Sequence, residues 1–268
     1  MGQDGGVNMK IAVSGKGGVG KTLVAGVLAD YFVKRGFKVL AIDADPTPNL
    51  ALTLGIPVET ANQIVPVSEN TELIALKTKT GFSGVYRLSF RVDDIIKDLS
   101  VKSPYGMNLL LMGTVRSVGG GCTCPANAVV RELLRHLMVE SDEAVIMDME
   151  AGIEHMGRGT AKHVDIMLIV TNPSFKSMET ARKIHSLAAE SGIKRVFIIG
   201  NKVATEEERE AIENFASETE IPLLDLIPYD EQIMKADLYG ESPLKYTGKS
   251  EGIEIIKKIG EKLVQFKA

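Results

Sequence analysis

Residues 15–22 have the types and the spacing that most directly predict chemistry. They read Gly-Lys-Gly-Gly-Val-Gly-Lys-Thr and fit the pattern of a glycine, four residues and then Gly-Lys-Ser/Thr. In a loop of this kind the backbone N–H groups surround phosphate groups, the second lysine reaches the β- and γ-phosphates, and the hydroxyl binds Mg²⁺. The predicted phosphate site consists of Gly15, Lys16, Gly17, Gly18, Val19, Gly20, Lys21 and Thr22.

Lys16 is an extra lysine that the loop pattern does not require. Taken from the loop alone, it is equally consistent with a solvated lysine and with a residue that acts on a second chain. Lys21 and Thr22 take the phosphate and Mg²⁺ roles. Residues 22–34 read as a helix whose positive N-terminal end would face the phosphates.

Three aspartates stand at the ends of apolar stretches that read as strands, where parallel sheets place their ligands. We expect Asp43 to support Mg²⁺ or the loop, and Asp45 to orient the attacking water. Asp148 matches the Mg²⁺-side carboxylate of nucleoside triphosphatases. Gly152, four residues later, would let a switch segment approach the γ-phosphate. For the first two aspartates, a simple turn before a proline is the competing interpretation.

Asn201 ends another apolar stretch and can hydrogen-bond a purine base. Guanine-specific loops place an aspartate three residues after such an asparagine, but this chain has Ala204 there. Guanine would leave its N1–H and N2–H₂ donors unpaired, and unmade buried hydrogen bonds are costly. The sequence therefore predicts ATP rather than GTP. Residues 227–230, which include Pro228, follow the next strand and are expected to form a wall of the base pocket, although a plain strand-to-helix turn explains them equally well.

Apolar strands that alternate with helical patterns must position these residues. We expect an α/β fold of the P-loop NTPase type, in which a mostly parallel sheet carries helices on both faces. The predicted strands are residues 10–14, 39–43, 107–112, 144–148, 166–171, 196–201 and 223–227. The predicted helices are residues 22–34, 126–140, 177–191, 206–219 and 253–266.

Residues 57–105 form the least regular part of the pattern. Residues 73–79 and 85–90 are predicted to pair as a β-hairpin around Gly81 and Gly84.

Length and composition limit the classes of protein. The chain has 268 residues, of which 44% are hydrophobic, and we expect one domain over residues 9–268. Residues 1–8 are polar and glycine-rich, and we expect them to be a disordered leader or to lie upstream of a second start at Met9. The net charge of −4 does not suggest a general nucleic-acid binder. No stretch has the length of a membrane span and no signal-peptide layout is present, so we expect a cytoplasmic protein with neither membrane nor nucleic acid as a partner.

The phosphate loop, the Asp-x-Asp-Pro segment at 43–46 and the Asp-x-x-x-Gly segment at 148–152 together resemble the deviant P-loop ATPases. That group includes the nitrogenase iron protein and the cell-division and partitioning ATPases, and the resemblance extends from about residue 9 to the end of the chain. It implies a homodimer in which Lys16 crosses the interface to touch the partner's nucleotide. Lys16, Lys21 and Asp45 are then the expected catalytic residues of an ATPase that uses ATP and Mg²⁺ and releases ADP.

Cys122 and Cys124 are the only cysteines in the chain, and one residue separates them. Cysteines this close form a strained disulfide, and a cytoplasmic setting keeps thiols reduced. Two thiolates are too few for a closed metal site, but two chains related by a twofold axis supply four, which suits tetrahedral Zn²⁺ or another thiophilic metal such as Ni²⁺. Two unliganded thiols in a glycine-rich turn are the competing interpretation.

The Cys-x-Cys motif, followed by Pro-Ala-Asn-Ala and a helix, and the string at residues 148–159 resemble the CooC-type maturation ATPases of nickel-dependent carbon monoxide dehydrogenase. The resemblance implies nickel insertion into the dehydrogenase, or into the related acetyl-CoA synthase complex, as client. His155 stands where the nitrogenase iron protein would carry its second cluster cysteine, which argues against a [4Fe-4S] cluster. His155 is either a switch residue between nucleotide and metal or a histidine at a helix start.

Two other functions remain open on sequence grounds. One is a positioning or partitioning ATPase whose dimer binds a membrane or DNA, because residues 253–266 place apolar residues at helical spacing beside lysines. An ordinary helix that packs on the sheet explains the same pattern, since Glu254 and Glu261 dilute the basic face. The other is an electron-donating iron–sulfur reductase that resembles the nitrogenase iron protein.

Overall fold

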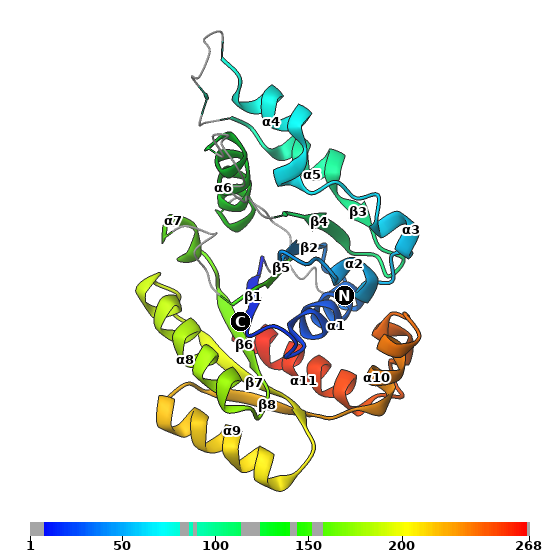
Figure 1. Ribbon diagram of the computed structural model, residues 1–268, viewed down its shortest axis with the longest axis vertical. Coiled ribbons are helices and arrows are strands. Elements are labelled where there is room, and N and C mark those ends of the chain that lie inside the picture. The colour runs from blue at the N-terminus through cyan, green and yellow to red at the C-terminus, as the bar shows by residue number, and fades with distance from the viewer. Residues whose placement is uncertain are drawn as a thin grey trace, which may run out of the picture.

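A mostly parallel sheet forms the centre of the molecule (Figure 1). The computed structural model describes residues 8–80, 86–87, 90–113, 124–139, 144–151 and 158–266. Within these residues the sheet has eight strands in the order β3-β4-β2-β5-β1-β6-β7-β8. Only β3 and β4 pair antiparallel; the other described pairs are parallel. The strands are β1 (Lys10–Ser14), β2 (Val39–Ala44), β3 (Val101–Lys102), β4 (Asn108–Leu111), β5 (Ala144–Met149), β6 (Ile166–Thr171), β7 (Val196–Val203) and β8 (Leu223–Pro228).

Helices cover both faces of this sheet (Figure 1). One apolar cluster joins the sheet to α6, α8 and α9, and the other joins it to α1, α2 and α11. Alternate residues of β1 serve the two clusters, because successive strand side chains point to opposite faces. The described helices are α1 (Lys21–Lys34), α2 (Leu50–Thr53), α3 (Val58–Ala61), η1 (Val67–Glu69), α4 (Thr71–Thr78), α5 (Asp93–Leu99), α6 (Cys124–Val139), α7 (Arg158–Ala161), α8 (Phe175–Glu190), α9 (Glu206–Thr219), α10 (Glu231–Leu238), η3 (Pro243–Tyr246) and α11 (Glu251–Gln265).

The predicted fold is confirmed, and each strand and helix predicted outside residues 57–105 begins and ends within two residues of its observed bounds. The predicted hairpin is wrong, because most of its first arm belongs to helix α4. The side chain of Asn70 caps this helix by accepting a hydrogen bond from the N–H of Leu73 at 3.0 Å. Leu73 and Ile74 then pack against the core that contains α6. An isolated antiparallel bridge between Lys79 and Tyr86 is described in this region; residues 81–85 and 88–89 lie outside the described part.

Helix α11 has its apolar face inside the protein. Ile253, Ile256, Ile259 and Leu263 are fully buried, and a Cβ at Gly260 would overlap the ring of Tyr31 on α1. The face that a membrane-surface helix would need is thus occupied by the protein's own core. Among the described helices, none is both long and apolar enough to span a bilayer.

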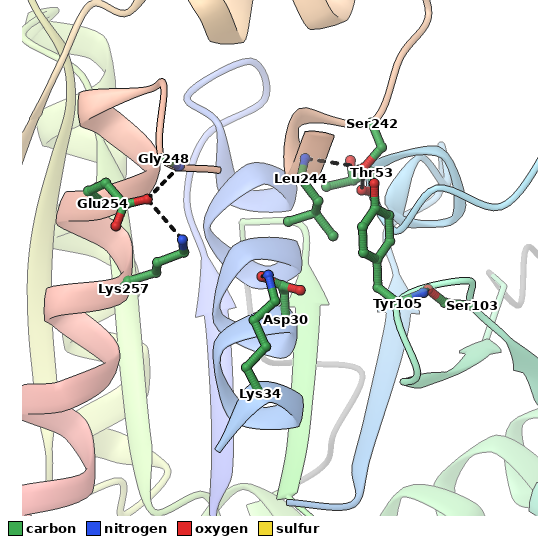
Figure 2. Close-up of polar contacts among 10 residues, drawn as sticks. All are labelled: Asp30, Lys34, Thr53, Ser103, Tyr105, Ser242, Leu244, Gly248, Glu254 and Lys257. Atoms are coloured by element: carbon green, nitrogen blue, oxygen red, sulfur yellow. Dashed lines mark hydrogen bonds and ion pairs between the residues drawn. The ribbon is translucent and has the colours of Figure 1, made fainter. Parts of the chain in front are cut away.

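Figure 2 shows polar contacts that connect α2, η3 and the start of α11 to neighbouring segments. Glu254 accepts hydrogen bonds from the N–H of Gly248 and from Lys257 at the start of α11. The Ser242 hydroxyl, just before η3, donates to the carbonyl of Thr53 on α2 at 2.6 Å. At the outer edge of the sheet, Lys262 donates to the carbonyl of Leu224 on β8 at 2.7 Å.

Candidate nucleotide site

The loop between β1 and α1 has the shape of an anion-binding turn. Close packing requires glycine at two of its positions: a Cβ at Gly15 would overlap the carbonyl oxygen of Val170 on β6, and one at Gly20 would overlap the side-chain amide of Asn201. Gly20 also has a φ of 98°. No side chain caps the start of α1, and its first turn contains no acidic residue. The first N–H groups of α1 can therefore receive an anion.

Lys21 is the cation at the centre of this loop. Its side chain is 5% exposed, and its Nζ donates to the carbonyl of Lys16 at 3.5 Å. The same Nζ lies 3.7 Å from Oδ2 of Asp45, which follows β2. The structure thus brings the predicted phosphate lysine and the predicted water-orienting carboxylate together. Lys16 itself is half-buried.

Asp43 holds the segment that follows β2. Its Oδ1 accepts a hydrogen bond from the N–H of Asp45 at 3.1 Å, and its Oδ2 accepts one from the N–H of Leu50, at the start of α2, at 2.9 Å. Burial raises the pKa of Asp43 to about 6, partly offset by these two hydrogen bonds. The carboxylate is therefore engaged by its own segment, whichever predicted role it takes.

Asp148 lies near the end of β5, the strand next to β1, and has a different environment. It is 1% exposed, and neither carboxylate oxygen accepts a hydrogen bond of good geometry from any described residue. Burial raises its pKa to about 7, and the negative charges of Asp43 and Asp45 act in the same direction. The nearby Thr22 hydroxyl and the charge of Lys21 oppose this rise without cancelling it. Two bare oxygens beside Thr22 fit a divalent cation, which would stabilise the charged carboxylate.

A pocket of about 500 Å³ opens beside the loop and has the volume of a small-ligand site. The predicted residues that line it include Gly20, Thr22, Asn201 and Pro228. Its opposite wall comes from α2 and from α10, and η3 is fixed to α2 by the hydrogen bond from Ser242. The pocket joins the loop, so its place suits the nucleoside part of a nucleotide.

Asn201 is turned toward the loop. Its Nδ2 donates to the carbonyl of Val19 at 2.7 Å, and its Oδ1 accepts from the N–H of Lys202. Tyr229 also lines the pocket, as predicted for residues 227–230, and the structure adds Lys202 and the inner face of α10, to which the sequence analysis gave no role in the site. Asp230 caps α10 by accepting from the N–H of Gln232, and an aspartate before an amphipathic stretch was a readable sign of this helix.

Most of the predicted metal and switch residues lie outside the part of the chain that the structure describes. Cys122, Gly152 and His155 lie outside the described residues, and of Cys124 only its place as the first residue of α6 is described. In the part of the chain that is described, no group of three or more His, Cys, Asp or Glu side chains could hold a metal ion.

A parallel sheet, a glycine-rich loop that leads into a helix with an uncapped start, and carboxylates at the neighbouring strand ends define a P-loop nucleoside triphosphatase. Residues 10–244 match the family described as the CobQ/CobB/MinD/ParA nucleotide binding domain, and the chain belongs to that family. It is an ATPase of this group.

Known relatives agree with this assignment. The carbon monoxide dehydrogenase accessory protein CooC of Rhodospirillum rubrum is 45% identical over 87% of this chain and 89% of its own. An uncharacterized ATP-binding protein of Methanocaldococcus jannaschii is 44% identical over 87% of this chain and 90% of its own. The cell division ATPase MinD of Pyrococcus furiosus has the same fold, with a TM-score of 0.69 and 22% identity over 97% of this chain and 100% of its own.

Proposed function

We propose that this ATPase works as a nucleotide-dependent homodimer that carries a metal on Cys122 and Cys124 and assists nickel insertion into carbon monoxide dehydrogenase or acetyl-CoA synthase. The observation that carries the proposal is the 45% identity to a carbon monoxide dehydrogenase accessory protein over most of both chains. The Cys-x-Cys motif agrees with it, since a metal carrier needs thiophilic ligands that can release their cargo.

In the proposed mechanism the loop residues bind ATP. The N–H groups at the start of α1 and the ammonium group of Lys21 hold the phosphates, and the nucleoside occupies the pocket between α2 and α10. Lys21 lies 3.7 Å from Asp45, so a phosphate bound at Lys21 would lie within reach of a water held by Asp45. Lys16 of each chain would touch the nucleotide of the other.

Thr22 and Asp148 are the residues that would hold Mg²⁺, with Asp43 behind them as support for the segment that contains Asp45. The ion, when bound, would supply positive charge to the phosphate oxygens. The fit rests on the buried oxygens of Asp148, which accept no hydrogen bond of good geometry, because a bound cation would stabilise the charged form of such a carboxylate.

The proposed dimer couples the two sites. Closure around ATP would bring two Cys-x-Cys motifs together, and their four thiolates would form a tetrahedral site for Zn²⁺ or Ni²⁺. Hydrolysis would reopen the dimer and release the metal, which requires that the two nucleotide states bind it with different affinities.

The experiment that tests the metal site is a double variant, Cys122→Ala with Cys124→Ala. We expect it to lose the stoichiometric metal, one per dimer, while it keeps its affinity for ADP, because the thiolates take no part in the phosphate loop. Metal content and oligomeric state should be measured together, with ADP and with a non-hydrolysable ATP analogue.

His185→Ala is the matched control, because it removes a potential metal ligand from helix α8 and should leave the metal in place. If the double cysteine variant still carried one metal per dimer, the assignment of Cys122 and Cys124 would be wrong.

A further inference from the structure

Lys202 has a backbone conformation that lysine rarely adopts. It has a φ of 62°, and among the described residues only Glu220 shares a positive φ without being glycine. The strained residue lies in an irregular step of the pairing between β7 and β8, between Gly200 and Val203. Strain of this kind persists only where the surrounding structure holds it, and it concentrates at functional sites.

The strained backbone directs the Lys202 side chain onto the phosphate loop. Its Nζ donates to the carbonyl of Gly18 at 2.9 Å, while the neighbouring Asn201 donates to the carbonyl of Val19 at 2.7 Å. Two consecutive residues at the end of β7 thus hold two consecutive carbonyl groups of the loop. Neither contact is local, since more than 180 positions separate the partners in the chain.

The two hydrogen bonds fix the orientation of two peptide groups of the loop, and each peptide group contains the C=O of one residue and the N–H of the next. Because each peptide is planar, the carbonyl of Gly18 sets the direction of the Val19 N–H, and the carbonyl of Val19 sets that of the Gly20 N–H. The Val19 N–H closes the turn onto the carbonyl of Lys16 at 3.4 Å. Lys202 therefore stabilises the loop in the shape that leads into α1.

Lys202 also belongs to the wall of the nucleoside pocket, beside Asn201, Pro228 and Tyr229. Its ammonium group reaches the loop, so its hydrocarbon stem spans from the pocket to the loop. A base that packs against this stem would restrict the same side chain that holds Gly18. One side chain thus joins the nucleoside end of the site to its phosphate end.

We infer that Lys202 is a positioning residue: it holds the phosphate loop in its binding shape through the carbonyl of Gly18 and presents its stem to the nucleoside. This inference rests on the proposed role of residues 15–22 as the phosphate site. Lys202 is not expected to touch the phosphates, because its Nζ is turned to a carbonyl oxygen. It should therefore strengthen the binding of ADP and ATP equally.

Lys202→Met tests this inference, because it keeps a stem of similar length and removes the donor. We expect the affinities for ADP and ATP to fall by the same factor, about tenfold, with kcat at saturating ATP within about twofold of the wild type. Lys202→Arg, which keeps a donor, should recover most of the affinity. Hydrogen exchange at the amides of residues 17–22 should become faster in nucleotide-free Lys202→Met.

Lys194→Met is the matched control, since it removes an exposed lysine from the residues before β7, at the opposite end of that strand, and should change none of these quantities. Lys202→Gly should relieve the backbone strain yet bind ADP at least as weakly as Lys202→Met, because it removes the stem as well as the donor, whereas Glu220→Gly should relieve strain without any effect on ADP. Unchanged ADP affinity in Lys202→Met, or a loss for ATP much larger than for ADP, would overturn the inference.

The proposed phosphate site has its own test. Lys21→Met should abolish tight nucleotide binding; if it bound ADP like the wild type, the loop assignment itself would fail, whatever the result at Lys202.

Discussion

The side chain of Asp148 combines complete burial with two oxygens that receive no hydrogen bond from the described residues. Taking a carboxylate out of water disfavours its charged form, and the pKa of about 7 expresses that cost. A nucleotide site gains from this arrangement, because a cation that arrives with the phosphates meets a carboxylate with free ligand positions. The nucleotide-free protein bears the cost as lost stability near neutral pH.

We predict that Asp148→Asn stabilises the nucleotide-free protein at pH 8. The folded pKa of about 7 lies above the unfolded value, so the native state binds the proton more tightly. Stability therefore falls as the pH rises from about 4 to about 7, by about 4 kcal/mol for this group. The asparagine of the variant would not titrate, so urea unfolding at pH 5 and pH 8 should differ less than in the wild type.

The pKa of Asp43 is also raised, to about 6, so this residue too lowers stability as the pH rises. The Asp148→Asn variant should therefore keep a smaller decrease of stability between pH 5 and pH 8. Asp98→Asn, at an exposed position of α5, is the control and should show the same decrease of stability between pH 5 and pH 8 as the wild type. Equal slopes for wild type and Asp148→Asn would show that Asp148 does not bear the cost of burial.

The phosphate loop at residues 15–22 was predictable from sequence because its pattern depends on local spacing alone, and the structure places residues 15–20 between β1 and α1 and residues 21–22 at the start of α1. The contact of Lys202 with Gly18 was not predictable in this way. It depends on an irregular step between two strands and on a side chain that crosses to a loop far away in the chain. No local pattern records either feature.

Among the elements, the four-residue helix α2 is stabilised mainly by its neighbours, since a helix this short has little stability of its own. Asp43 accepts from its first N–H, and the Ser242 hydroxyl donates to the carbonyl of Thr53 at its end. Leu52 and Thr53 of α2 line the nucleoside pocket. The two contacts therefore hold this part of the pocket wall in place, one from Asp43 on β2 and one from Ser242 before η3.

We predict that Ser242→Ala weakens nucleoside recognition more than phosphate recognition. The variant loses the hydrogen bond to α2 and the cap of η3, where Ser242 accepts from the N–H of Leu244. ADP affinity should fall about threefold and stability by about 1 kcal/mol, while pyrophosphate affinity stays unchanged. Calorimetric titration with ADP and with pyrophosphate measures both affinities, and urea unfolding measures the stability.

Asn70→Ala is the matched control, because Asn70 caps α4 in the same way but neither Asn70 nor α4 lines the pocket. It should lower stability and leave the ratio of the two affinities alone. If Ser242→Ala lost ADP and pyrophosphate affinity in parallel, the link between α2 and the pocket would be refuted.

Prediction from sequence worked best for the elements that the sheet needs. Strands such as β6 are continuous apolar runs and were placed correctly, because burial on both faces leaves few alternatives. Helix α4 was mistaken for a strand, since Leu73 and Ile74 suit either structure and the decision comes from Asn70 and from packing near α6. Tertiary contacts of this kind are absent from a single sequence.

At the scale of the whole molecule, the proposed dimer gives Lys16 its role in the partner's site. We predict that Lys16→Ala and Lys21→Ala are each inactive alone and that a one-to-one mixture regains activity. A mixed dimer pairs an intact loop with a partner that still supplies Lys16, so about a quarter of the wild-type turnover should return. Phosphate release from the mixture, at concentrations that allow exchange, is the measurement.

The control is a mixture of Lys21→Ala with a double variant that carries both Lys16→Ala and Lys21→Ala. Neither chain in this mixture has Lys21, so no complete site can form. Full activity of Lys16→Ala alone would show that Lys16 is a solvated loop lysine.

The outer edge of the sheet has a consequence for the behaviour of the protein in a crowded cell. β8 is the last strand, and such a strand offers its backbone to any extended chain that approaches. Here Lys262 occupies the Leu224 carbonyl and places a charge at that edge, next to Asp225, while Pro222 and Pro228 at the two ends have no N–H to donate. Strand addition from a second sheet would have to displace this lysine, so the open edge is guarded against aggregation.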